Sequence, residues 1–314
     1  MVNCNISNSS SFIFILMELP GLEDAHHWTA IPVCSIYFLS FLGNIAIIYI
    51  VKSVPSLHTP MYLFLSMLSM ADLGLSASTM PSMVAVYFLG HRKINAAACF
   101  AQLFFIHTFA VIESAVLLAM AFDRCVAICE PLRYATILTN WRISAIGLAI
   151  VIRSAALHLP LLVLLNNLNF KSISALSHSY CVHPDVLKLS CSNTRVNGAL
   201  GLFVVLSTLG LDVLLILFSY VLILYTVLSI ASHAERLKAL NTCISHIFAV
   251  LLFYTPTISL SMVHRFGKKL PAHVYMLLSY LHFLVPPMLN PIVYTIKTKE
   301  IRVRILRMLH PKKF

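Results

Sequence analysis

The sequence predicts an all-α membrane protein, a seven-transmembrane helix bundle followed by a short amphipathic cytoplasmic helix. Hydrophobic residues make up 59% of the 314 residues and charged residues only 11%. A soluble domain has about 25% charged residues, because its surface faces water. Seven apolar runs are also long enough to cross a hydrocarbon layer, which takes roughly 20 helical residues. A chain with this composition needs lipid around most of its surface.

The predicted spans follow one another along the chain and form one transmembrane domain over residues 28–296. Residues 1–27 precede it as an N-terminal tail, and residues 297–314 follow it as an amphipathic helix and a tail. The spans are Trp28–Val51, Pro60–Leu89, Ala96–Phe122, Ile143–Leu165, Val196–Ala231, Ala239–Val263 and Ala272–Ile296. Because their number is odd, the two ends of the chain are expected on opposite sides of the membrane.

Lysine and arginine placement predicts the orientation, because cytoplasmic segments carry an excess of these residues. Residues 1–27 contain none, whereas residues 297–314 contain seven. We therefore expect a multi-pass protein of the plasma membrane whose N-terminus is extracellular. The acceptor triplets at Asn5 and Asn8 predict glycosylation of that tail. The net charge of +11 indicates contact with the lipid bilayer rather than nucleic acid, since the basic residues lie at membrane boundaries and not on one folded face.

The longest extracellular connection, residues 166–195, contains Cys181 and Cys191. Cys99 lies in the first turn of the third span, on the same side of the membrane. A disulfide between Cys99 and Cys181 is therefore expected to hold this loop over the bundle. For Cys191 two alternatives stay open, a bond to Cys4 or a free thiol.

The segment Thr298–Leu309 follows the last span. Its apolar residues fall on one helical stripe with arginines beside them, which predicts an interfacial helix under the membrane rather than a disordered basic tail. The stripe consists of Ile301, Ile305, Leu306 and Leu309.

Ionisable side chains inside the spans are sparse, and such groups usually face the bundle interior. Asp72 in the second span and Glu113 in the third lie at mid-membrane depth. Together they could share a proton, bind a sodium ion or join a water-linked network. A protonated carboxyl group in a structural hydrogen bond would also satisfy burial. No other cofactor is expected.

A charged pair lies at the cytoplasmic end of the third span, where Arg124 follows Asp123. Glu113 lies eleven residues before Arg124, about three turns, so both share one helix face. Adjacent opposite charges can hold one another in a closed state, and a partner that takes over the arginine would favour an open one. An ordinary interfacial ion pair is the alternative.

Prolines interrupt the seventh span near Asn290, and Pro291 directly follows that residue. Proline removes a backbone hydrogen bond and bends a transmembrane helix. Asn290 is expected to meet either the freed carbonyl groups or Asp72. Tyr294 is expected to move as the bend changes.

Several motifs at the span junctions coincide with this organisation. They are Gly43-Asn44, Leu57 to Tyr62 (LHTPMY), Met120 to Arg124 (MAFDR) with Val126 to Cys129, Ser219-Tyr220, Lys238-Ala239 with Thr242 to His246, and Asn290-Pro291 with Tyr294. The set resembles the rhodopsin-type receptor framework in its olfactory-receptor form, over nearly the whole chain. The resemblance implies an odorant ligand and a stimulatory heterotrimeric G protein that raises cyclic AMP. It also implies that the chain is not an enzyme.

Three further motifs resemble class I (fish-like) olfactory receptors, a branch associated with carboxylic acids and other small polar odorants. They are Pro20 to Glu23, Ser179 to His183, and Val263 to Gly267. The resemblance implies a ligand cavity between spans three to six, beneath the long loop. Carried over to this sequence, its residues are His107, His158, Leu161, His183, Gly201, Val205, Ser261 and Arg265.

Arg265, at the outer end of the sixth span, is the implied anchor for a carboxylate. A guanidinium group suits bidentate hydrogen bonding to that group, and Ser261 lies one turn below. The alternative is a solvated loop charge beside Lys268 and Lys269.

Four positions depart from the family pattern. Cys125 stands in place of the usual tyrosine after Asp-Arg, which puts coupling in doubt. Lys171 stands where many members have a cysteine, so a loop disulfide from that position to Cys191 is not expected. Pro184 replaces a position that can hydrogen-bond short acids, and His158 is more polar than the expected aromatic residue.

Other classes of function fit the sequence less well. The chain has 14 histidines, and His178, Cys181 and His183 cluster in the loop. Two imidazoles beside a disulfide cysteine do not complete a four-ligand zinc site, so no metal is expected. A membrane transporter would show repeated halves, which are not evident. No enzyme motif is present. A chemosensory receptor used outside the nose stays an open alternative.

Overall fold

Seven long helices form the body of the protein in a computed structural model, which describes residues 12–18, 26–266 and 271–309. Each is long and apolar enough to cross a membrane. The helices are α1 (His26–Ser53), α2 (Pro60–Tyr87), α3 (Ala96–Cys129), α5 (Asn140–Asn166), α7 with α8 (Arg195–Val205 and Leu211–Ser229), α9 (His233–Phe266), and α10 with α11 (Ala272–Phe283 and Val285–Lys297). The predicted fold class is therefore confirmed.

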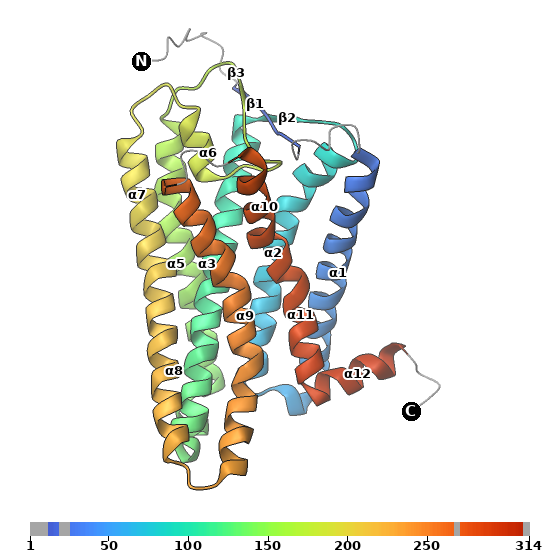
Figure 1. Ribbon diagram of the computed structural model, residues 1–314, viewed down its shortest axis with the longest axis vertical. Coiled ribbons are helices and arrows are strands. Elements are labelled where there is room, and N and C mark those ends of the chain that lie inside the picture. Colours follow the sequence, from blue (N-terminus) through green and yellow to red (C-terminus); the bar gives the residue numbers. More distant parts are fainter. Residues whose placement is uncertain (1–11, 19–25, 267–270, 310–314) are drawn as a thin grey trace.

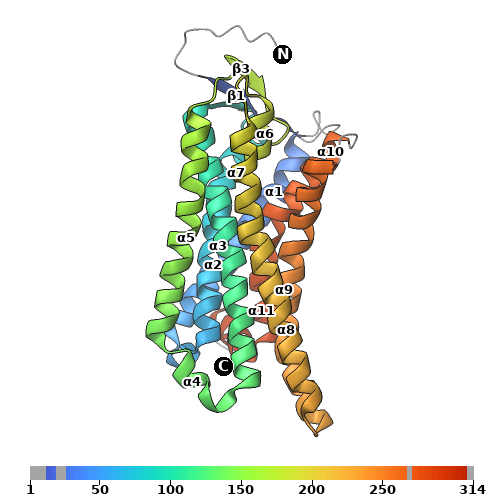
Figure 2. The same cartoon turned by 90° about the vertical axis from the view of Figure 1, so that its left-hand side faces the viewer.

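The helices stand side by side in a bundle (Figures 1 and 2). The central helix is α3, which packs against α2, α5, α8 and α9. One end of the bundle, here called the loop face, carries β1 (Ile13–Ile15) and the long connection before α7. The opposite end, here called the tail face, carries α4 (Tyr134–Ile137) and α12 (Lys299–Leu309).

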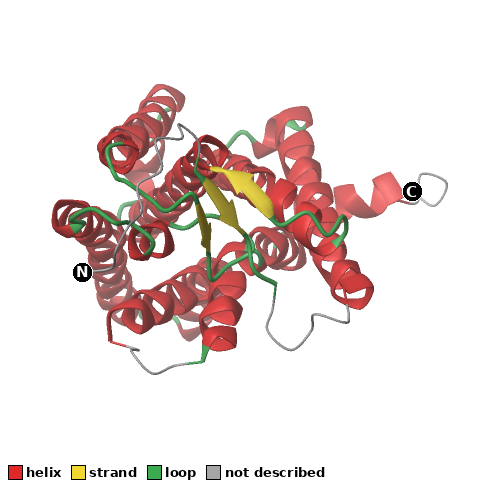
Figure 3. Ribbon diagram, turned by 90° about the horizontal axis from the view of Figure 1, so that it is seen from above, coloured by secondary structure: helices red, strands yellow, loops and turns green. Residues whose placement is uncertain are grey.

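A small sheet covers the loop face, which the sequence pattern did not predict (Figure 3). Its strands β1 (Ile13–Ile15), β2 (Lys93–Asn95) and β3 (Ile173–Ala175) lie in the order β2-β1-β3. β1 is antiparallel to β2 and parallel to β3. Part of the predicted N-terminal tail is thus the central strand of this sheet. Its Phe14 ring is fully buried and packs edge-on against Phe170 at 5.4 Å, so an aromatic contact ties the tail to the loop.

A disulfide joins Cys99 at the start of α3 to Cys181 in the long loop, the pairing expected from the sequence. Cys191 is also disulfide-bonded, so the alternative of a free thiol was wrong. Lys171 is exposed in the same loop. Cys4, Asn5 and Asn8 lie outside the described residues, as does any glycan attached there.

The seventh span breaks at Leu284, between α10 and α11, where two prolines follow. Pro291 has no N–H group to offer the carbonyl of Pro287, four residues earlier. The side chain of Asn44 on α1 donates to that carbonyl at 2.8 Å. Next to it, a Cβ on Gly43 would lie 2.7 Å from Pro291, so only glycine lets α1 approach the bend this closely. The Gly43-Asn44 motif therefore supports the bent helix.

The fifth span contains a π-helical turn, η4 (Leu206–Gly210), between α7 and α8. π turns insert an extra residue into a helix and recur at functional sites. One side of this turn faces the bundle interior, where Thr208 is fully buried, and the other side faces outward, where Leu206 is exposed. The turn thereby sets which α7 residues face inward above it.

The amphipathic helix α12 runs sideways from the foot of α11 at the tail face (Figure 1). Ile301 is fully buried and Ile305 packs beside it against the core formed by α1, α2 and α3. Leu306 is 41% exposed, and the side chain of Leu309 lies outside the described part of the chain. The stripe predicted from the sequence therefore divides between the bundle and its outer surface.

Candidate ligand-binding site

A cavity of about 260 Å³ lies among the helices directly beneath the long loop. Seven of the residues implied by the sequence line it, namely His107, His158, Leu161, His183, Gly201, Val205 and Ser261. Arg265 lies in α9 one turn beyond Ser261, but its side chain is outside the described part of the structure. Pro184, noted from the sequence as a departure, also lines the cavity.

The seventh span contributes to the cavity as well, which the sequence analysis did not expect. Ser279, His282 and Phe283 of α10 line it together with Thr257 of α9. A signal was present in the sequence, since His282 is a polar residue inside the seventh apolar run. Polar residues in a span face the bundle interior or a cavity.

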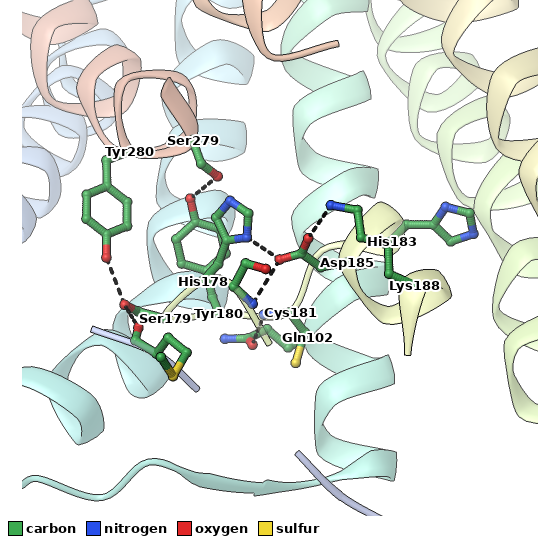
Figure 4. Close-up of polar contacts among 12 residues, drawn as sticks. Gln102, His178, Ser179, Tyr180, Cys181, His183, Asp185, Lys188, Ser279 and Tyr280 are labelled. Atoms are coloured by element: carbon green, nitrogen blue, oxygen red, sulfur yellow. Dashed lines mark hydrogen bonds and ion pairs between the residues drawn. The ribbon is translucent and has the colours of Figure 1, made fainter. Parts of the chain in front are cut away.

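The loop over the cavity, residues 167–194, is fastened by buried hydrogen bonds (Figure 4). The Tyr180 hydroxyl lies 2.6 Å from that of Ser279, and the Ser179 hydroxyl lies 2.7 Å from that of Tyr280. Gln102 of α3 accepts from the backbone N–H of Cys181 at 3.0 Å. These bonds join the loop to α10 and to α3, so we call this loop the lid.

Asp185 is the internal anchor of the lid, at the start of α6 (His183–Lys188). Its carboxylate accepts from His178, from Lys188 at 3.1 Å and from the backbone of Ser177 at 3.2 Å. Burial alone would raise the pKa of Asp185, but the hydrogen bond and charge of His178, with the charge of Lys188, lower it to about 2. The anchor therefore stays ionised throughout the physiological pH range.

His183 points from the lid toward α7, where its ring lies against Gly201. A Cβ on that glycine would lie 3.0 Å from the imidazole, so the small residue makes room for the ring. Burial, and after it the neighbouring His158 imidazole, lowers the pKa of His183 to about 4. Its Nε2 atom is buried without a hydrogen-bond partner among the described residues.

A polar network not predicted from the sequence lies one turn below the cavity. Asp212 of α8 is fully buried and accepts from Arg153 of α5 at 3.0 Å and from Ser114 of α3 at 2.8 Å. The Ser114 hydroxyl has one proton, so the Tyr254 hydroxyl of α9, 2.7 Å away, donates to it. Four helices meet in this network. The sequence placed Arg153 and Asp212 in neighbouring spans, and opposite charges there usually pair.

The predicted carboxyl pair lies deeper in the bundle. The Asn290 amide of α11 donates to Asp72 of α2 at 3.1 Å and to Glu113 of α3 at 3.3 Å. All three side chains are buried. Of the two partners expected for Asn290, the structure therefore gives it Asp72, while the freed carbonyl of the bend is met by Asn44 instead.

At the tail face the Asp123–Arg124 pair is closed on itself. The Arg124 guanidinium donates from Nε to Asp123 at 2.9 Å and makes a second bond through Nη2. The Tyr134 hydroxyl of α4 donates to the other carboxylate oxygen at 2.7 Å. Both charged side chains are buried, so this pair is not an ordinary exposed interfacial one.

Tyr220 and Tyr294, two tyrosines of the motifs at the span junctions, lie near this pair. Tyr220 of α8 is 2.7 Å from His246 of α9, whose other ring nitrogen donates to the carbonyl of Leu117 at 2.9 Å. Because Nε2 of His246 donates, its Nδ1 accepts from Tyr220. The Tyr294 hydroxyl contacts the Met120 sulfur at 3.9 Å. His246 thus links α3, α8 and α9, a role that the sequence pattern did not predict.

Cys125, which replaces the tyrosine typical of this motif, packs in a small apolar cluster with Ile223, Val227 and Cys243. Its sulfur lies 3.9 Å from that of Cys129, one turn later. Among the described residues, no group of three or more His, Cys, Asp or Glu side chains is placed to hold a metal ion.

Comparison with known proteins identifies the relatives of this chain. The family model described as Olfactory receptor matches residues 33–312. Human Olfactory receptor 51G2 is 56% identical over 301 residues, which cover 96% of each chain. Human Olfactory receptor 51L1 and Olfactory receptor 51E1 are each 54% identical, and cover 98% and 99% of this chain and 97% of their own lengths. Identity at this level over nearly the whole chain leaves no support for a transporter.

The lid should loosen in mild acid through His183. Its pKa in the closed lid lies below the usual 6.5, so its contribution to the closed state is complete above pH 6.5 and is lost as the pH falls toward 4. Asp185 stabilises the closed lid fully above its usual pKa of 3.8, and this stabilisation is lost only as the pH falls toward 2. Going from pH 7.4 to 5.5 should therefore favour opening by about 1.3 kcal/mol, or roughly tenfold.

Hydrogen exchange of the purified receptor at the two pH values, expressed as protection factors for the lid, measures this change. The His183→Gln receptor is the matched control, because glutamine does not titrate. An equal loss of protection in both proteins would assign the effect to another group.

Loss of Asp212 should strongly destabilise the bundle. The Asp212→Ala change leaves Arg153 without its counter-charge, which costs about 3 kcal/mol for a largely buried pair and lowers the melting temperature by roughly 6–12 °C. The Glu130→Ala receptor is the control, since Glu130 and Arg133 form an exposed pair at 3.0 Å. Thermal unfolding in detergent compares the two. Similar melting temperatures for both variants would show that the buried pair contributes little.

Proposed function

Because this chain belongs to the olfactory receptor family, whose members are G-protein-coupled receptors and not enzymes, we propose that it detects a small carboxylic acid odorant. The cavity beneath the lid carries the proposal. It is small, lies between α3, α5, α7, α9 and α10, and combines an apolar wall with a few polar side chains, as ligand sites do. Its outer end lies one turn below Arg265. A guanidinium there suits a carboxylate better than a lysine would, because its planar fork binds both oxygens.

We further propose that the loop face is extracellular and the tail face cytoplasmic, which places the basic segment 297–314 on the inside. Odorants then reach the cavity through the lid. The Asp123–Arg124 pair faces the compartment that holds the heterotrimeric G protein. The chain would act at the plasma membrane.

Signalling requires two states with different affinities for the ligand. A ligand bound between the lid and α9 would draw α7 and α9 together at the loop face. The tail-face end of α9 would then move outward, break the Tyr220–His246 contact and uncover Arg124. Lys238 lies in the first turns of α9 and would be uncovered with it. We propose that a stimulatory G protein binds this opened end and raises cyclic AMP.

A cyclic-AMP assay in cells expressing the full chain tests the ligand class. Short and medium-chain carboxylic acids should activate, and the corresponding alcohols should be weaker. The Arg265→Ala change should lower acid potency about tenfold to a hundredfold, because it removes charge-assisted hydrogen bonds. Lys268→Ala is the matched control for loss of a nearby positive charge. Arg124→Ala should abolish the response to every ligand.

Equal potency of an acid on the Arg265→Ala and unchanged receptors would remove the anchoring role. If alcohols activate and no acid does, the proposed ligand class is wrong. Surface display measured on intact cells separates both results from poor expression.

For the inner polar cluster we propose a sodium ion held by Asp72, Glu113 and Asn290. One oxygen of Glu113 and the amide oxygen of Asn290 are buried without a hydrogen-bond partner among the described residues. Such acceptor oxygens suit a hard cation, whereas a single proton shared by the carboxyl groups would leave the amide oxygen unsatisfied. Sodium would stabilise the closed state.

Replacing sodium by a large organic cation should then raise agonist affinity about threefold to tenfold in membranes, a coupling of ordinary size. Glu113→Gln should abolish the difference. Sodium-independent affinity in the unchanged receptor would favour the shared proton instead.

A further inference from the structure

Two imidazoles in the cavity have their protons fixed by the protein. The first is His158 of α5, whose Nδ1 lies 2.8 Å from the backbone carbonyl of Ser154. A carbonyl oxygen only accepts, so Nδ1 carries the proton. In the neutral ring Nε2 then has a lone pair and no hydrogen. His158 is 4% exposed and lines the cavity, so a ligand bound there would meet this lone pair and shield it from water.

The second is His282 of α10, whose Nδ1 lies 2.8 Å from the hydroxyl oxygen of Thr257. That hydroxyl donates its single proton to the carbonyl of Phe253. The imidazole must therefore donate from Nδ1, and its Nε2 also has a lone pair. His282 is 5% exposed and lines the same cavity. Within the described residues, neither Nε2 atom has a hydrogen-bond partner.

These two acceptors lie toward the inner end of the cavity. Thr257, which orients His282, is nine residues from the loop-face end of α9 at Phe266, or roughly 13 Å along the helix. Ser261 is one turn nearer that end, and Arg265 one turn nearer again. His158 is eight residues, roughly 12 Å, inside the end of α5 at Asn166. The inner and outer ends of the cavity therefore offer different chemistry.

We infer that His158 and His282 make the inner end of the cavity a hydrogen-bond-accepting surface that selects ligands with a hydroxyl group opposite their acid group. The preferred odorants are hydroxy acids of medium chain length. This inference deepens the proposed function, because it takes the carboxylate to be held at the outer end.

The chemistry of the inner end excludes the other common polar groups. A carboxylate would bring its own lone pairs against those of the imidazoles, and an ether or ketone has no proton to donate. An ammonium group donates, but it would bring an unpaired charge into a poorly solvated site, at a cost of several kcal/mol. A hydroxyl group donates without carrying a charge. It satisfies an acceptor that an alkyl chain would leave buried and unpaired.

His183 does not place a hydrogen-bond donor at the inner end of the cavity, because it lies elsewhere. Its unpartnered Nε2 lies in the lid, at the side of α7 and Gly201, and its backbone N–H already donates to His107 at 3.2 Å. Its ring has no contact that fixes the tautomer among the described residues. The His183 ring of the lid can therefore donate or accept, whereas the Nε2 atoms of His158 and His282 only accept.

The test compares three ligands that differ at one end. They are a medium-chain acid, its ω-hydroxy derivative and the methyl ether of that hydroxy acid, measured by cyclic-AMP response in cells with the full chain. The hydroxyl donates and the ether does not, although both accept. We expect the hydroxy acid to be about fivefold to tenfold more potent than the other two, the effect of one buried hydrogen bond. A methyl ether as potent as the hydroxy acid would overturn the inference.

Two variants locate the acceptor. His158→Phe keeps a flat ring and removes Nε2, whereas His158→Gln keeps an acceptor oxygen near that position. The advantage of the hydroxy acid should fall to within about twofold in the first and persist in the second. Should His158→Phe not reach the cell surface, Thr257→Val serves instead, because it releases the His282 ring to turn and present its N–H. The ether should then gain on the hydroxy acid.

A loss of potency that is equal for all three ligands in each of these variants would overturn the selective role of the imidazoles. The proposed function fails differently. If no acid activates the receptor, the proposed ligand class is wrong. The same comparison is then made with three other ligands: an alcohol that activates, the diol that carries a second hydroxyl group, and the methyl ether of that diol. A donor preference there would support the accepting surface, and its absence would overturn it.

Discussion

Polar groups in the hydrocarbon interior cannot be left to water, and this constraint determines how the seven helices meet. Lipid tails are as apolar as leucine, so burying leucine between helices gives little preference for one arrangement over another. A carboxylate or a freed carbonyl in the same place is costly unless a particular donor reaches it. The Asp212–Arg153 pair and the bond from Asn44 to Pro287 therefore fix α5 to α8 and α1 to α11 at defined heights.

The central helix α3 contributes polar side chains from the cavity to the tail face. His107 reaches the cavity, Glu113 and Ser114 lie in the middle of the bundle, and Asp123 lies at the tail face. Consecutive side chains at Glu113 and Ser114 point to different neighbours, the first toward α2 and α11 and the second toward α8 and α9. This explains why α3 is the most buried of the helices and why it contacts most of the others.

Helix α9, which packs against α3, carries a matching series. Thr257 orients His282 in the cavity wall, Tyr254 donates into the Asp212 network, and His246 binds Tyr220 and α3. The three residues lie within about three turns of one helix face. A displacement of α9 at the cavity therefore strains contacts in every layer at once, which is a physical basis for two discrete arrangements.

The sequence predicted the spans and most of the cavity because both depend on local patterns. Apolar length defines a span, and seven cavity residues followed from motif positions. Contacts that depend on the relative height of two helices were not predictable in the same way. Arg153 and Asp212 are 59 residues apart, and nothing in their own segments shows that they share a depth. The strand at Phe14 was missed because three residues without a repeating pattern give no periodic signal, and its partners come from two distant loops. The prolines in the sequence indicated the break in the seventh span. They did not indicate that α10, before the break, would line the cavity.

Histidine is well suited to a cavity governed by this constraint. It can use one ring nitrogen to satisfy the protein and leave the other for a ligand, and the first contact determines whether the second donates or accepts. A serine hydroxyl in a helix would instead rotate to bond the carbonyl one turn earlier, as Ser154 does with Ile150. The lid completes the arrangement, since Asp185 keeps it folded over the cavity that the imidazoles line. An acceptor that a bound ligand shields from water discriminates strongly between a ligand that donates and one that does not.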